Sequence, residues 1–252
     1  MLKLSYILLF IVLWSIILFV VNTAMKKTNV ESKRRQKYLT ICTLIIGAWF
    51  GIQHLTIESG FYSTLDLPPR IPLFMILPLF LFTFTFLFRK RSSAVLNAIP
   101  TPIPIFYQSF RAVIEVLFYY TFLQGILPEQ VTFSGANYDV LLGISAIPMG
   151  IYALRKTANK KLLIAWNIIG IGVVGFAAFT FITSFYFPSF WGISAATISL
   201  KFAHYPFMLL PSFFMPSAIF VHVMSIIQLS NQLKNENINA PNNSGIEKSL
   251  VH

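Results

Sequence analysis

Long apolar runs alternate along this chain with short polar or basic segments. A membrane-spanning helix needs about 20 mainly apolar residues, and seven runs are close to that length or longer. They cover approximately residues 4–24, 38–57, 71–88, 105–127, 139–154, 162–187 and 207–228. The fifth run is short, and the sixth is long enough to tilt in the bilayer. The pattern therefore predicts an all-α fold, a seven-transmembrane-helix bundle that forms a single domain over residues 1–228.

The composition agrees with a membrane location. Hydrophobic residues make up 56% of the chain and charged residues only 11%, whereas a soluble domain has about 25% charged residues. So few charges cannot cover the surface of a soluble globule, and the lipid bilayer is the first partner that we expect.

Basic residues mark one side of the predicted membrane domain. Of the 19 Lys and Arg residues, 15 lie between apolar runs or in the C-terminal segment: Lys26, Lys27, Lys33, Arg34, Arg35, Lys37, Arg89, Lys90, Arg91, Arg155, Lys156, Lys160, Lys161, Lys234 and Lys248. These clusters follow the first, third, fifth and seventh runs. Because basic loops stay in the cytoplasm, we expect the N-terminus outside and the C-terminus in the cytoplasm.

The formal net charge of +11 does not indicate a nucleic-acid partner, since no polar domain is available to present a basic surface. The basic segment at residues 26–37 either binds anionic lipids or only determines topology, and both interpretations stay open. The C-terminal segment, residues 229–252, is rich in Asn and has no aromatic residue. We expect it to be a disordered cytoplasmic tail.

Motifs that resemble catalytic or cofactor sites lack the context that they need. The GxGxxG pattern at residues 170–175 lies inside an apolar run, without the strand and acidic residue of a dinucleotide site, and its small residues suit helix packing. The last run has no lysine for a retinal Schiff base, and the histidines are not spaced as metal ligands. The single cysteine, Cys42, cannot form an intrachain disulfide. We therefore expect no cofactor and no metal, while the question of enzymatic activity stays open.

The fourth run carries a polar stripe. Gln108, Arg111, Glu115 and Tyr119 fall on one face of a helix. A charge at the centre of a span costs about 2.5–3.5 kcal/mol, so we expect Arg111 and Glu115 to form a coupled pair that faces the interior of the bundle. Depth along the predicted spans brings Asn22, Asn167 and His222 level with Arg111. Gln108, Arg111, Glu115, Tyr119, Asn167 and His222 are therefore the candidate binding residues, in a pocket that opens toward the cytoplasm.

The connection after the fourth run completes a pattern with this stripe. Gln108, Arg111 and Glu115 are followed by Pro128, Gln130, Thr132, Phe133, Gly135, Asn137 and Asp139. Over residues 106–145 the chain resembles a group of uncharacterised bacterial multi-pass membrane proteins. The resemblance implies a location in the bacterial inner membrane and no particular activity.

Three classes of function remain open at this point. The leading expectation is binding or transport of a small polar or anionic molecule, or of a proton, at Arg111 and Glu115. A membrane-embedded enzyme that acts on a lipid-like substrate is the second class. A structural or assembly subunit, with charges that pair only internally, is the third. The sequence does not identify protein partners.

Overall fold

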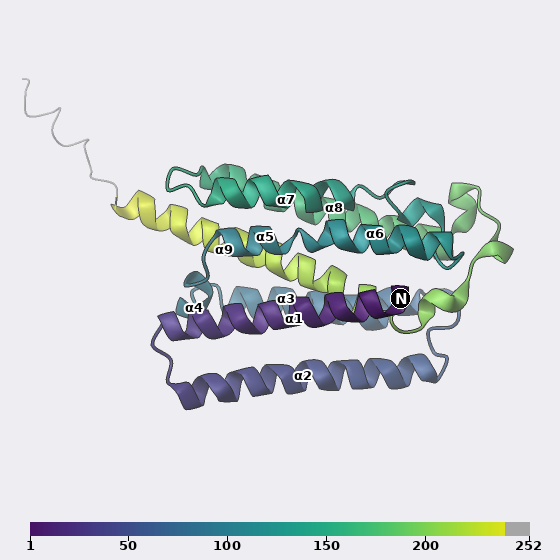
Figure 1. Ribbon diagram of the computed structural model, residues 1–252, viewed down its shortest axis with the longest axis horizontal. Coiled ribbons are helices and arrows are strands. Elements are labelled where there is room, and N and C mark those ends of the chain that lie inside the picture. Colours follow the sequence, from purple (N-terminus) through teal and green to yellow (C-terminus); the bar gives the residue numbers. More distant parts are fainter. Residues whose placement is uncertain (240–252) are drawn as a thin grey trace, which may run out of the picture.

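The computed structural model describes residues 1–239, and all regular structure in that part of the chain is helical (Figure 1). Five helical stretches are long and apolar enough to cross a membrane. They are α1 (Leu2–Lys27), α2 (Ser32–Glu58), α3 (Leu77–Arg89) with the π-helical turn η1 (Pro72–Ile76) before it, α8 (Lys160–Tyr186), and α9 (Met215–Asn239) with the π-helical turn η6 (Leu210–Phe214) before it. The all-α expectation is thus confirmed.

Three shorter helices complete the bundle: α5 (Pro102–Tyr107), α6 (Phe110–Leu123) and α7 (Asp139–Ala153). The expected continuous helix over 105–127 is instead broken between α5 and α6, where the amide of Arg111 donates to the carbonyl of Gln108, only three residues back, at 3.1 Å. Helix α7 has 15 residues, which gives about 22 Å of helix, less than the hydrocarbon thickness of about 30 Å. It ends well short of the full length of α8 (Figure 1).

The remaining helical turns are short. Helix α4 (Ala94–Asn97) precedes α5, and 3₁₀ turns occupy the connections at the opposite end of the bundle: η2 (Glu129–Val131), η3 (Pro188–Trp191), η4 (Ala195–Thr197) and η5 (Leu200–Ala203).

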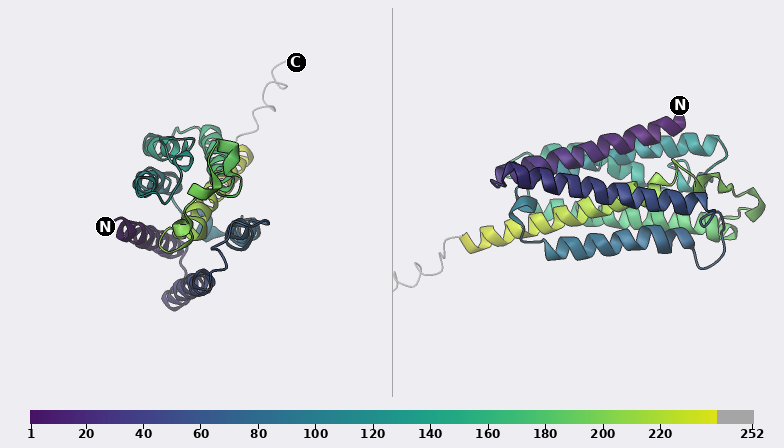
Figure 2. Two further views of the ribbon diagram at one scale, coloured as in Figure 1. Left: turned by 90° about the vertical axis from the view of Figure 1, so that its right-hand side faces the viewer. Right: turned by 90° about the horizontal axis from the view of Figure 1, so that it is seen from below.

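Helix α9 is the central element of the bundle. It packs against α8, α3, α5 and α4, and 67% of its most apolar window is buried, compared with 11% for α1 and α2. Helix α2 lies at the edge, as the end-on view in Figure 2 shows. Its exposed side chains include Leu44, Ile45 and Leu55. An apolar surface of this kind suits lipid and not water.

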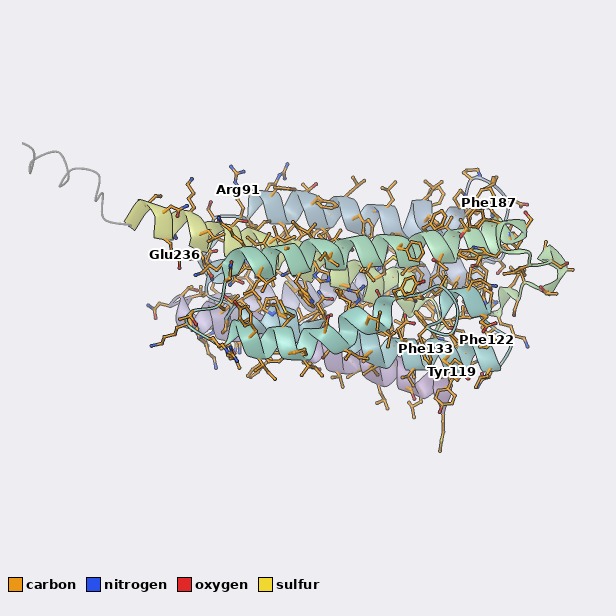
Figure 3. The ribbon with its side chains drawn as sticks, turned by 90° about the horizontal axis from the view of Figure 1, so that it is seen from above. Arg91, Tyr119, Phe122, Phe133, Phe187 and Glu236 are labelled. Carbon is orange, nitrogen blue, oxygen red and sulfur yellow. The ribbon has the colours of Figure 1, made fainter. Side chains whose placement is uncertain are left out.

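The two ends of the bundle differ in chemistry. The connections α1–α2, α3–α4 and α7–α8, which carry the basic clusters, and the C-terminal end of α9 all lie at the same end (Figure 1). There Lys160 of α8 pairs with Glu236 of α9. Figure 3 shows Arg91 and Glu236 at this end, and Tyr119, Phe122, Phe133 and Phe187 at the other.

The C-terminal boundary differs from the expected one. Helix α9 continues to Asn239, so residues 229–239 are helical and not part of a disordered tail. Tertiary contacts explain the difference, because Leu229 is fully buried and the Asn231 side chain donates to the carbonyl of Arg91 at 2.7 Å. The expectation for residues 240–252 lies outside the described residues.

Candidate functional site

An ion pair between Arg111 and Asp139 lies in the interior of the bundle. Arg111 Nε donates to Asp139 Oδ2 at 2.8 Å, and Arg111 Nη2 pairs with Oδ1. Arg111 is 1% exposed. The expected Arg111–Glu115 pair is therefore replaced by a pair with a residue from another element. The physical reason is geometric: Asp139 meets two guanidinium nitrogens with both of its oxygens, a bidentate arrangement that a planar guanidinium favours.

The third nitrogen of the guanidinium continues the network. Arg111 Nη1 lies 3.1 Å from His222 Nε2, and His222 Nδ1 lies 2.9 Å from Asn167 Oδ1. Because an arginine only donates, Nε2 must accept, and the ring proton is assigned to Nδ1, which donates to Asn167. Asn167 Nδ2 in turn donates to the carbonyl of Leu163 at 2.8 Å. The expectation that His222 and Asn167 lie level with Arg111 agrees with this geometry.

Glu115 lies beside this network with a different partner. Its Oε1 accepts a hydrogen bond from Asn137 Nδ2 at 2.7 Å. Its Oε2 is buried and has no hydrogen-bond partner among the described residues, and the side chain is fully buried. With Arg111 neutralised by Asp139, the carboxyl group of Glu115 is left without a bonded cation. A proton or a ligand that donates a hydrogen bond would satisfy Oε2.

The α6–α7 connection, residues 124–138, folds into the bundle and brings Asn137 to Glu115. Val131 is fully buried, and its carbonyl accepts from Asn137 Nδ2 at 3.0 Å. Asn137 Oδ1 accepts the amide of Asp139 at 3.1 Å, an Asx turn that leads directly into α7. Non-helical backbone at membrane depth is tolerated only against protein or a cavity, which fits this buried loop.

A glycine makes the turn in this connection possible. A Cβ at Gly135 would overlap the backbone of Glu129 and Gln130, so only glycine fits there. The amide of Asn137 then reaches the carbonyl of Thr132 at 3.2 Å. Gly135, Thr132, Asn137 and Asp139 all belong to the pattern on which the resemblance in the sequence rests.

Two further glycines bring the helices of the site close together. A Cβ at Gly143 of α7 would overlap the backbone at Arg111 and Ala112 of α6, and one at Gly170 of α8 would overlap the His222 ring. The packing interpretation of the GxGxxG segment is therefore correct at Gly170. At Gly172 and Gly175 nothing lies within 4 Å of the added atom, so these two positions do not take part in helix packing.

The other predicted residues have separate positions. Gln108 is buried at the α5–α6 break, where Nε2 donates to the carbonyl of Ala218 at 3.1 Å. Tyr119 is half-buried and stacks on Phe133, with ring centroids 5.0 Å apart, near one end of the molecule (Figure 3). Asn22 is half-buried on α1 and is outside the network. The four residues of the predicted polar stripe therefore do not form one site, and Tyr119 lies apart from the network of Arg111.

Sequence reasoning named Asn137 and Asp139 only as part of the pattern that follows the fourth run, and not as site residues. It also missed a polar stripe on α9. His222, Ser225 and Gln228 follow one another at three-residue spacing, and all are fully buried. Ser225 Oγ and Gln228 Oε1 have no hydrogen-bond partner among the described residues. This spacing is a helical signal that a scan of the last apolar run could have found. The stripe runs from the charged cluster toward the basic end of the bundle.

Two cavities adjoin the site. The first, of about 30 Å³, is lined by Arg111, Glu115, Asn137 and Asp139 together with apolar residues of α6, α8 and α9. That is enough space for a water molecule, which needs about 10–15 Å³. The second, of about 60 Å³, is lined almost only by apolar and aromatic side chains. Phe118, Phe181, Leu210 and Met215 line both cavities.

Apolar helices around a buried charged cluster are the architecture of an integral membrane protein. Within residues 1–239, no group of three His, Cys, Asp or Glu side chains is placed to hold a metal ion. Comparison of the chain with family models, with curated proteins and with solved structures found no match.

Proposed function

We propose that this chain is a seven-span protein of a cell membrane that binds and moves a proton at Glu115. One observation carries the proposal: Glu115 is fully buried and lines a cavity, and its Oε2 has no hydrogen-bond partner within residues 1–239, while Arg111 is occupied by Asp139. Ionisable side chains inside a membrane bundle are expensive and mark ion and proton pathways. Among the ligands first expected, the arrangement favours a proton over an anion, because an anion would have to displace Asp139 from Arg111.

The polar stripe on α9 gives this proton a route. From the cluster, His222, Ser225 and Gln228 extend through the buried face of α9 to the end where Gln232 Nε2 donates to Thr101 Oγ1 at 3.1 Å. The hydroxyl of Ser225 can exchange a proton with a water molecule, and the unused acceptor of Gln228 can hold such a water in place by a hydrogen bond. With the basic clusters on the cytoplasmic side, this route leads from the centre of the membrane to the cytoplasm.

A structural role is the second candidate, and it is favoured because each of the three guanidinium nitrogens of Arg111 has a partner inside the bundle. Asp139, His222 and the guanidinium satisfy one another, as in a pair that only orients helices. Glu115 is the residue that separates the two proposals, because a purely structural carboxyl group needs no exchange of protons.

Proton flux into vesicles tests the function. The purified protein is reconstituted with a pH-sensitive dye inside, and a potassium gradient with valinomycin supplies the driving force. We expect Glu115→Gln to abolish the flux and to leave folding intact, because the amide keeps the shape and the contact with Asn137. Glu129→Gln, which changes an exposed carboxyl group in the same connection, is the matched control and should behave as the original chain. Equal flux in the Glu115→Gln vesicles would refute the proposal.

A further inference from the structure

Helix α2 is attached to the rest of the bundle in only one of its halves. In the half away from the basic clusters, Phe50 packs on Phe10 with ring centroids 4.9 Å apart, and Gln53 accepts a hydrogen bond from the hydroxyl group of Tyr62 at 2.9 Å. In the half near the basic clusters, the side chains of residues 32–43 hydrogen-bond only within α2 or to the adjacent α1–α2 connection, among the residues that the structure describes.

The side of α2 that is buried in the attached half is exposed in the other half. Ile57, Gln53, Cys42 and Tyr38 fall on one side of the helix, because they are separated by about one or three full turns. Ile57 and Gln53 are 1% and 3% exposed, whereas Cys42 is exposed and Tyr38 is 41% exposed. The described part of the chain therefore leaves this side of α2 open near the basic end.

Two arginines are held beside the open side at the start of α2. Arg34 Nε donates to the hydroxyl oxygen of Tyr38 at 2.9 Å, and the guanidinium carbon of Arg34 lies 5.6 Å from the centroid of the Tyr38 ring. Arg35 Nη1 donates to the carbonyl of Val30 in the α1–α2 connection at 2.9 Å. Neither arginine forms an ion pair with a described residue. A guanidinium has five N–H donors, so both groups keep donors for an anion.

The charge around these arginines is complementary to a phosphate group. Residues 26–37 contain six Lys and Arg residues and one acidic residue, Glu31, and none of the six is paired within residues 1–239. A guanidinium can bind a phosphate through two parallel hydrogen bonds. Since Arg34 and Arg35 lie at the end of a helix long enough to cross the membrane, a phosphate there is at the level of the lipid headgroups. Cys42 lies about 10 Å further along α2, at the level of the acyl chains.

We propose that the start of α2 binds one anionic phospholipid. The phosphate accepts hydrogen bonds from Arg34 and Arg35, and an acyl chain of the same molecule lies on the open side of α2, over Tyr38 and Cys42. Of the two interpretations that the sequence left open for residues 26–37, this geometry favours lipid binding. The inference does not depend on the movement of a proton at Glu115.

Native mass spectrometry of the full chain in detergent measures the binding. Dioleoyl phosphatidylglycerol and dioleoyl phosphatidylcholine have the same chains and differ in net charge, and we expect the anionic lipid to bind more tightly. The double variant Arg34→Gln/Arg35→Gln should weaken phosphatidylglycerol by about 25-fold, about fivefold for each charge removed, and leave phosphatidylcholine unchanged. Glutamine keeps a high helix propensity, so we expect α2 to remain folded.

The matched control removes two charges from another connection at the same end. Arg155 and Lys156 are exposed between α7 and α8, which pack against each other. We expect Arg155→Gln/Lys156→Gln to keep the affinity for phosphatidylglycerol. An equal loss in both double variants would show a general attraction of the basic end for anions, and would overturn the inference.

Cys42 reports the position of the acyl chain in the protein without any substitution. It is the single cysteine of the chain, so its reaction with N-ethylmaleimide can be followed by mass. We expect the fraction of thiol protected from reaction to follow the fraction of protein that carries phosphatidylglycerol. Unchanged reaction with the lipid bound, or equal protection by inorganic phosphate, would overturn the inference. Protection in a dimer without bound lipid would also overturn it, because a second copy of the chain would then cover this side of α2.

Discussion

At the scale of single residues, the buried side chain of Arg111 has two partners, Asp139 and His222, where the sequence predicted one, Glu115. The guanidinium of Arg111 binds Asp139 with two nitrogens and His222 with the third. Removing one member of a buried ion pair costs about 3–5 kcal/mol, because the remaining charge is left without a partner. Removing both members leaves no such charge. Stability measurements can therefore show which carboxyl group is the true partner of Arg111.

We predict that Arg111→Leu and Asp139→Leu each destabilise the protein by about 3–5 kcal/mol, and that the double variant loses less than the sum. The reason is that the two charges compensate each other in the folded bundle. The measurement is reversible unfolding in mixed detergent micelles, followed by circular dichroism, with the coupling energy taken from the double-mutant cycle.

The control is the cycle of Arg111→Leu with Glu115→Leu. In that double variant Asp139 remains as an unpaired charge, so we expect no comparable rescue. A large coupling energy in this second cycle and none in the first would show that Arg111 pairs with Glu115 and not with Asp139, as the helical spacing alone suggested.

The sequence identified the residues of α6, α8 and α9 in this site but not those of the α6–α7 connection. Arg111 and Glu115 are recognisable because charge is rare in an apolar run, and His222 and Asn167 because depth in a bundle can be counted from the ends of the helices. Asn137 was out of reach, since a polar loop between two spans normally lies in water, and Asp139 was placed only at the start of the fifth apolar run. Only the fold shows that this loop enters the bundle.

At the scale of elements, the proline residues before and within α9 determine its irregular start. Pro216 has no amide hydrogen, so the carbonyl of Ser212, four residues earlier, lacks its helical donor. The indole Nε1 of Trp49 on α2 donates to this carbonyl at 3.2 Å. A proline leaves a carbonyl free by its chemistry alone, but nothing local could predict that a residue 163 positions away would bind it.

We predict that Trp49→Phe destabilises the bundle by about 1–3 kcal/mol, the cost of an unsatisfied buried acceptor. The expected loss includes weaker attachment of the peripheral helix α2, which is measured as faster proteolysis of the 28–31 connection in detergent. Trp14→Phe is the matched control, because Trp14 packs on Phe213 without a described hydrogen bond from its indole. Equal losses in both variants would show that apolar area and not the hydrogen bond to Ser212 holds α2.

At the scale of the whole molecule, the two ends of the bundle carry different kinds of residue. The basic clusters, which are spread over the sequence, lie at one end (Figure 1), and the connections with exposed aromatic residues lie at the other (Figure 3). Aromatic belts form at both membrane interfaces, so only the basic residues give a direction. The lengths of the apolar runs predicted the five long apolar helices, because apolar length is a direct requirement of the bilayer. They could not predict the break between α5 and α6, because Gln108 at the break contacts a distant helix, where its side chain donates to the carbonyl of Ala218 on α9.

The direction can be tested with cysteine labelling, and the structure decides where the probes belong. Asn137 lies in a predicted outer connection, but its side chain is 3% exposed and binds Glu115, so a probe there would damage the site. Ser194 and Ser92 are exposed at opposite ends. With Cys42→Ala as background, we predict that Ser194→Cys reacts with a membrane-impermeant maleimide on intact cells and that Ser92→Cys reacts only after permeabilisation. The positive-inside rule requires this order. Labelling of Ser92→Cys alone on intact cells would invert the topology, and with it the route proposed for the proton.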